Sequence, residues 1–229
     1  MRPLKIITSG AQAAPVEALL PDYAGAVDLA FGSSLGSAHD SIPTRLGEGQ
    51  RFDIYLLAQT GHEKLGEAGV LSAPFVPLVE SRIGAAVAEG DTPPDISTPD
   101  ALRAALLDAG SVAHAASASG IYLSTIVFPA LGIAETMKDK ARTIYSERVG
   151  RVVARGEAAL GFQQMSELIP IPGITIVGSL PPEFDRTFVF GASLGDDPDM
   201  QDAANDFLDF LRSERAAEEF ARWGLDPIG

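Results

Sequence analysis

The chain has 229 residues, of which 46% are hydrophobic, and this is enough for one large domain or two lobes with a sizeable core. Its formal net charge of −14 argues against nucleic acid as a partner, because phosphates need a basic face. A small anion is still compatible with this charge, since local N–H groups and one or two arginines can hold it. The sequence has no cysteine, which excludes disulfides and thiolate metal sites.

The first residues of the sequence and its hydropathy indicate the cellular compartment in which we expect the protein. A strand-like run at 4–8 follows Met1 almost directly, with no apolar segment of signal length before it. We therefore expect a cytoplasmic protein as written, and a periplasmic one if a leader was removed. No stretch approaches 18 uninterrupted apolar residues, so we expect no membrane insertion, and a permease partner only if the protein is exported.

Strand and helix signals alternate along the first part of the chain. "LKIITSG" predicts a strand and a turn, and "AAPVEALLPDYAG" predicts a helix with Pro15 in its first turn. "FDIYLLA" is the continuous apolar run typical of a strand buried on both faces. The other elements expected here are a strand at 26–34, a short helix at 38–49 and a helix with its exit at 61–71.

The alternation restarts at Ser81. "DISTPDALRAALLDA" predicts a helix with Ser97 or Thr98 as N-cap and Pro99 in its first turn. An amphipathic pattern predicts one last helix from Asp199 to Trp223. Between them we expect strands at 81–90, 111–115, 159–164, 174–180 and 186–195, and helices near 121–131 and after 147.

Strands separated by helices of this length are typical of parallel βαβ sheets. The sequence therefore predicts an α/β protein of two lobes around a ligand cleft. Lobe 1 comprises 1–80 plus 189–229, and lobe 2 comprises 81–188.

Several blocks resemble one protein family in the same order. They are "DISTPDALRAALLDA", "ASASGIYLSTIVFPALGI", "ERVGRVVARGEAALGFQQMSELIPI" and "GITIVGSLPPEF". Together they resemble the bacterial extracellular solute-binding proteins related to the molybdate-binding protein, over nearly the whole chain and most strongly over 94–182. The resemblance implies the type II periplasmic-binding-protein fold, in which each lobe is a mostly parallel sheet flanked by helices.

The same resemblance implies a ligand held by hydroxyls and backbone N–H groups of strand-to-helix loops. The positions that it assigns are Ser9, Gly10, Ser33 and Ser34 in one lobe and Ser117, Ser119 and Gly120 in the other. The alternative for each of these turns is that its serine only caps the start of a helix. "GFQQMSEL" departs from the Asp- and Tyr-containing pattern of molybdate binders, which favours a carboxylate or another organic anion. The group also includes aconitate isomerase, so the fold is compatible with proton transfer.

Several residues have two readings each. His39 is either a surface residue beside Asp40 or a general base, and Glu147 is a second candidate base. Tyr122 either donates a hydrogen bond to the ligand or packs against neighbouring residues. Arg148 or Arg45 either binds a ligand carboxylate through two parallel hydrogen bonds or is solvated. Gln163 and Gln164 are adjacent on a predicted strand, so alternation would point one of them to the cleft. The alternative is that both belong to a structural hydrogen-bond network. Three residues are expected to have no role in binding: His114 is packed in the core, His62 is solvated and Glu167 supports a helix N-terminus.

Two functions remain open from the sequence. The first is an aconitate-isomerase-like enzyme that shifts a double bond in a di- or tricarboxylate by proton transfer. The alternative is a solute-binding receptor of an ABC transporter for a molybdate-like oxyanion or an organic anion. We expect no cofactor, since no phosphate loop, metal-spaced cluster or nucleophile elbow occurs, and hence no metal site.

Overall fold

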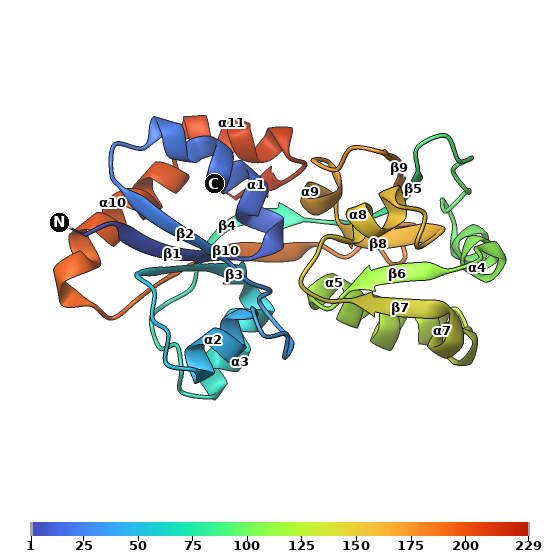
Figure 1. Cartoon of the computed structure of the whole chain (residues 1–229), viewed down its shortest axis with the longest axis horizontal. Helices are drawn as coiled ribbons and strands as arrows, with labels where there is room; N and C mark the ends of the chain where they lie inside the picture. Colours follow the sequence, from blue (N-terminus) through green and yellow to red (C-terminus); the bar gives the residue numbers. More distant parts are fainter. Residues whose placement is uncertain (1, 229) are drawn as a thin grey trace. The chain divides into compact units, whose positions relative to one another are not determined.

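The computed structural model describes residues 2–228, which divide into two compact units. Of the described residues, unit 1 comprises 2–81 with 188–228, and unit 2 comprises 82–187. These bounds differ by one residue at each crossing from the lobes expected from the sequence. Both units are mixed α/β structures, which confirms the predicted fold class (Figure 1). The expectation of mostly parallel sheets is wrong, because at least half of the strand pairs in each sheet are antiparallel.

Unit 1 is a six-stranded sheet covered by helices, in the order β11-β4-β10-β3-β1-β2. Figure 1 shows α1 and α11 on one face of this sheet and α2 and α3 on the other. Its elements are β1 (Leu4–Thr8), α1 (Gly10–Leu19), the 3₁₀ turn η1 (Leu20–Asp22), β2 (Val27–Phe31), α2 (Ile42–Gly47), β3 (Ile54–Ala58), α3 (Gln59–Glu67), β4 (Val76–Ser81), β10 (Phe188–Leu194), the 3₁₀ turn η3 (Pro198–Met200), α10 (Gln201–Leu211), α11 (Glu214–Arg222) and β11 (Asp226–Pro227).

Unit 2 is a five-stranded sheet in the order β7-β6-β8-β5-β9. Its elements are β5 (Ile83–Ala88), α4 (Pro99–Asp108), β6 (Val112–Ala115), α5 (Ala118–Tyr122), the π-helical turn η2 (Leu123–Val127), α6 (Phe128–Ala130), α7 (Ala134–Lys140), β7 (Ala141–Ile144), α8 (Val149–Ala154), β8 (Leu160–Gln164), α9 (Met165–Leu168) and β9 (Ile174–Ser179). Thr98, one of the two predicted N-cap residues, caps α4 by accepting a hydrogen bond from Ala101 N at 3.1 Å.

The parallel pairing in each sheet is confined to three strands. In unit 1, β1 pairs in parallel with β2 and β3, and in unit 2, β6 pairs in parallel with β7 and β8. The remaining pairs, which involve β10, β11, β5 and β9, are antiparallel. Within each unit the three parallel strands therefore end at one common edge, which we call its carboxyl edge.

The structure corrects three sequence expectations. The last helix is broken into α10 and α11, because the Ser213 hydroxyl accepts from Ala216 N and starts a new helix. Helix α1 begins at Gly10, so Pro15 lies inside it and not in its first turn. Strands β4 and β7 were not expected from the sequence at all.

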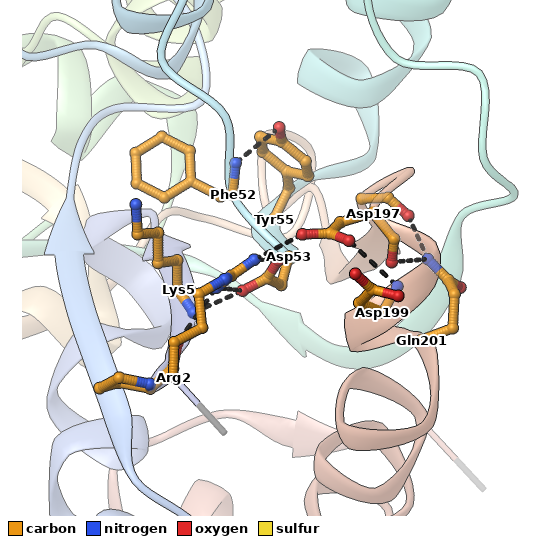
Figure 2. A network of polar contacts seen from close by, with 10 residues as sticks. Arg2, Lys5, Phe52, Asp53, Tyr55, Asp197, Asp199 and Gln201 are labelled. Carbon is orange, nitrogen blue, oxygen red and sulfur yellow. Dashed lines mark hydrogen bonds and ion pairs between the residues drawn. The ribbon is translucent and has the colours of Figure 1, made fainter.

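A network of hydrogen bonds and ion pairs connects three segments of unit 1 at the edge of its sheet opposite the carboxyl edge (Figure 2). Arg2 donates to both oxygens of Asp53, at 2.7 and 2.8 Å, and to Asp197 at 2.8 Å. Asp53 also accepts from Lys5 N at 2.7 Å. Burial raises the pKa of Asp53, but the hydrogen bonds from Arg2 and Lys5 outweigh it, and its pKa lies below the ordinary value. This network ties the start of β1 to the approach to β3 and to the loop after β10.

Candidate functional site: two carboxyl edges

The carboxyl edge of unit 1 carries three connections side by side. Strand β1 leads through Ser9 into α1, β2 leads into the loop containing Ser33 and Ser34, and β3 leads directly into α3. Neither α1 nor α3 has an acidic residue in its first turn or a side-chain cap. The unbonded N–H groups and dipoles at both helix starts therefore favour an anion.

Three polar side chains at this edge have no hydrogen-bond partner among the described residues. Ser9 Oγ at the N-cap of α1 is one of them, and both amide atoms of Gln12 and Thr60 Oγ1 are the others. Ser9 and Gln12 are buried, and Thr60 lies in the first turn of α3. Because a buried polar group without a partner costs about 1–3 kcal/mol, these groups need an explanation beyond the fold.

The predicted serine pair after β2 already makes internal hydrogen bonds. Ser33 Oγ donates to Leu35 O at 2.7 Å, so its proton is used. Ser34 Oγ accepts from Ala58 N at 2.8 Å, which leaves its own O–H as a donor. Close packing holds this arrangement, since a Cβ on Gly61 would lie 2.7 Å from Ser34 O. Of the pair, Ser34 is therefore the residue that can still donate to an anion.

His39 is not in a helix, contrary to the sequence expectation. It is exposed in the turn before α2, which begins at Ile42 because Ser41 is its N-cap. Arg45 holds this loop by donating to Asp40 O at 3.1 Å and to Gln50 at 3.2 Å. The other histidine of this unit, His62, was expected to be solvated, but it is half-buried, with Nε2 2.9 Å from Ala73 O.

The carboxyl edge of unit 2 begins with the small-residue turn after β6. Ser117 is the N-cap of α5, and its Oγ lies 3.3 Å from that of Ser119 in a hydrogen bond. Ser119 is fully buried. A Cβ on Gly120 would lie 1.7 Å from Ala115 O, so only glycine fits there. The hydroxyl pair retains one free proton, which is a donor at the end of β6.

Tyr122 and His114 flank this turn. Tyr122 Oη donates to Phe184 O at 3.3 Å, and Arg186 lies over its ring at 5.8 Å. His114 is buried, as predicted, against Phe128, and burial lowers its pKa. The positions of both residues are consistent with structural roles.

The loop between β7 and α8 holds Glu147 and Arg148. The candidate base Glu147 is exposed and accepts two hydrogen bonds from Arg155 at 3.1 Å. Ser146 beside it has φ 56°, a rare conformation for a residue other than glycine. Arg148 is half-buried at the N-cap of α8 and acts electrostatically on Glu167.

The two strand amides have different environments, as alternation predicts. Gln163 is a structural bridge, whose Oε1 accepts from Val149 N at 2.7 Å and whose Nε2 donates to Glu167 Oε2 at 2.7 Å. Gln164 is buried, and neither of its amide atoms has a partner among the described residues. Burial raises the pKa of Glu167 to about 7, although Arg148 and Gln163 oppose this.

Sequence reasoning did not identify four of these polar groups. They are Gln12, Thr60, Ser166, whose buried hydroxyl also has no partner among the described residues, and Glu167, which was assigned to helix support. Gln12 and Thr60 could have been found, because each lies in the first turn of a helix that follows a buried strand. Glu167 could not, because its burial depends on packing between α9, β5 and α8.

The described residues contain no group of three or more His, Asp or Glu side chains placed to hold a metal ion. No helix within residues 2–228 is long and apolar enough to cross a membrane. The two edges instead offer neutral hydroxyl and amide donors together with helix N-termini. Such groups can bind a carboxylate or another oxyanion and can stabilise negative charge that develops on it.

Comparison with known proteins agrees with this architecture. An aconitate isomerase from Pseudomonas sp. is 38% identical over 230 residues, covering 98% of this chain and 88% of that protein. The periplasmic molybdate-binding protein of Azotobacter vinelandii superposes with a TM-score of 0.74 at 19% identity, covering 97% of this chain and 98% of its own. PEB3 from Campylobacter jejuni superposes with a TM-score of 0.68 at 14% identity, covering 97% and 99%.

The match to a family model extends over residues 4–226, which includes both carboxyl edges. The chain therefore belongs to the family described as bacterial extracellular solute-binding protein.

Proposed function

We propose that this protein is an isomerase that moves a C=C bond within a small unsaturated polycarboxylate of the aconitate type. The observation that carries the proposal is the 38% identity to an aconitate isomerase over nearly the full chain. The fold by itself is shared with a molybdate-binding protein at 19% identity, so it does not select the activity.

The unpartnered polar groups support an anionic substrate. Ser9, Gln12 and Thr60 in unit 1 and Gln164 in unit 2 keep donors that no described residue uses. A carboxylate bound at either edge would accept hydrogen bonds from the groups of that edge and offset the cost of burying them. Neutral donors of this kind bind carboxylates even in a chain of net charge −14, because they act at short range.

The same donors fit the chemistry of a double-bond shift. A base removes a proton from the saturated carbon next to the C=C bond, and the resulting carbanion is delocalised over the allylic carbons and their carboxylates. Return of the proton to the other end of the allylic system moves the double bond, and no oxidant or reductant is needed. N–H and O–H groups directed at the carboxylate oxygens stabilise the intermediate charge.

The test combines binding and turnover. The protein is first screened by thermal shift against cis- and trans-aconitate, saturated tricarballylate, molybdate and sulfate. Each stabilising compound is then incubated with the protein in D₂O and followed by proton NMR. We expect stabilisation by the tricarboxylates, interconversion of the two aconitates and deuterium at the allylic carbons.

The family description favours a second candidate, a solute-binding receptor. A receptor would be stabilised by its ligand without any chemical change to it. Stabilisation by an aconitate with neither interconversion nor deuterium uptake would overturn the isomerase proposal in favour of the receptor.

A further inference from the structure

Glu167 differs from the other buried carboxylates of the described chain in its partners. Asp53 accepts from Arg2, and Glu219 accepts from Arg215 and Arg222. Glu167, which is equally buried, accepts only from the neutral amide of Gln163, through Oε2. This hydrogen bond engages Oε2 and leaves Oε1 outside the bridge to Gln163. A buried carboxylate without an ion-pair hydrogen bond is costly, so fold stability does not account for it.

The position of Glu167 places it at the carboxyl edge of unit 2. It lies on α9, which follows β8 directly, and β8 is the parallel neighbour of β6, whose end carries Ser117 and Ser119. The same short segment holds the buried and unpartnered amide of Gln164 and hydroxyl of Ser166. Glu167 is thus an ionisable group within a cluster of unused polar atoms at the edge where parallel strands present functional loops.

Its orientation is fixed by a specific bridge. Gln163 joins Glu167 Oε2 to Val149 N, the first amide of α8, with both hydrogen bonds at 2.7 Å. Because one amide oxygen and one amide nitrogen are used, the bridge works only in this orientation of the Gln163 side chain. It engages one carboxyl oxygen and leaves the other available to exchange a proton.

We propose that Glu167 is the proton carrier of the isomerisation, and this inference rests on the proposed function. The ionised carboxylate takes a proton from the saturated allylic carbon of a substrate held at this edge. The resulting acid exchanges its proton with solvent and then delivers a proton to the opposite allylic carbon, so Glu167 ends the cycle ionised and solvent deuterium enters the product. Gln163 is a positioning residue that holds the carboxyl group during both transfers.

The electrostatic surroundings suit this role near neutral pH. Burial raises the pKa of Glu167 to about 7, where a carboxylate is a stronger base than in water. Arg148 is the charge that opposes this rise. Of the other charged groups on the elements packed around α9, Arg151 on α8 is exposed, and Arg82 before β5 pairs with Asp185.

The experiment compares Glu167→Gln with the wild type and with Glu135→Gln. Glutamine keeps an oxygen for Gln163 but cannot accept the proton, whereas Glu135 is exposed and paired with Lys138. We expect Glu167→Gln to lower kcat for aconitate at least about 100-fold and to abolish deuterium uptake. Glu167→Gln should bind inert tricarballylate no more weakly than the wild type, and Glu135→Gln should retain wild-type kcat.

The outcomes separate the two proposals. If the wild type converts no aconitate, the proposed function fails, and the role of Glu167 fails with it. If both the wild type and Glu167→Gln turn over equally, the isomerase stands and the proton carrier is another residue. If Glu167→Gln does not fold, the pH profile of wild-type kcat decides. The proposal requires a rise centred near pH 7, and a flat profile from pH 5 to 9 overturns it.

Discussion

The hydroxyl oxygen of Ser34 accepts a hydrogen bond from the backbone N–H of Ala58 at 2.8 Å, which joins the end of β2 to the start of α3. Both residues are buried. A serine that the resemblance assigned to ligand binding therefore also holds the carboxyl edge of unit 1 together.

Ser34→Ala should destabilise the protein by about 1–3 kcal/mol, because it leaves the buried Ala58 N–H without an acceptor. The change is measured as the free energy of unfolding in urea. Ser37→Ala is the matched control, since Ser37 is exposed in the same loop, and it should have no effect. Equal stability of the two variants would contradict the structural role of Ser34.

Ser9→Ala, in contrast to Ser34→Ala, should weaken ligand binding without lowering the stability of the fold. Ser9 Oγ has no partner among the described residues, so its removal should leave stability unchanged or slightly higher. Its free O–H is a donor for an anion, and its loss should weaken tricarballylate binding about 10-fold, which corresponds to about 1.4 kcal/mol. Calorimetric titration measures the affinity. Ser33→Ala, whose proton is used by Leu35 O, should bind within about 3-fold of the wild type. An unchanged affinity in Ser9→Ala would remove this hydroxyl from the site.

Gly120→Ala should destabilise unit 2 by more than about 3 kcal/mol. Its new Cβ would lie 1.7 Å from Ala115 O and 2.6 Å from His114 Nδ1, and the first of these is a backbone atom that cannot easily move. Gly110→Ala is the control, because a Cβ there meets no atom within 4 Å and its φ lies outside the left-handed region. Thermal unfolding should show a large loss of Tm for the first variant and a small gain for the second. A wild-type Tm for Gly120→Ala would show that this turn is not packed as described.

Asp53→Asn should destabilise the protein by about 2–3 kcal/mol at pH 7, because it weakens the paired hydrogen bonds with Arg2. The pKa of Asp53 is lower in the folded chain than its ordinary value of 3.8. Its contribution is therefore fully present above the unfolded pKa of about 4, and it is lost as the pH falls through the folded pKa. Urea unfolding at several pH values should show the difference from wild type shrinking below pH 4. Glu135→Gln, in an exposed pair with Lys138, should show no such dependence.

Local sequence signals predicted several of the strand-to-helix connections that form the two carboxyl edges. Ser9 and Ser117 were found because a buried strand, a small polar residue and a helix start are neighbours in the chain, and such patterns depend on local backbone preferences. The N-cap Thr98 was one of two predicted choices for the same reason. His39 was misplaced into a helix because Ser41, two residues later, takes the capping position.

The sequence by itself thus determined the α/β alternation and the small-residue turns after β1, β2 and β6. Only the tertiary structure decided which polar groups are already used. Gln163 reaches Val149, 14 residues away, and Arg2 reaches Asp53, 51 residues away. The burial that raises the pKa of Glu167 comes from separate elements packed around α9. Hydrogen bonding and desolvation depend on neighbours in space, and a pattern of residue types along the chain does not specify those neighbours.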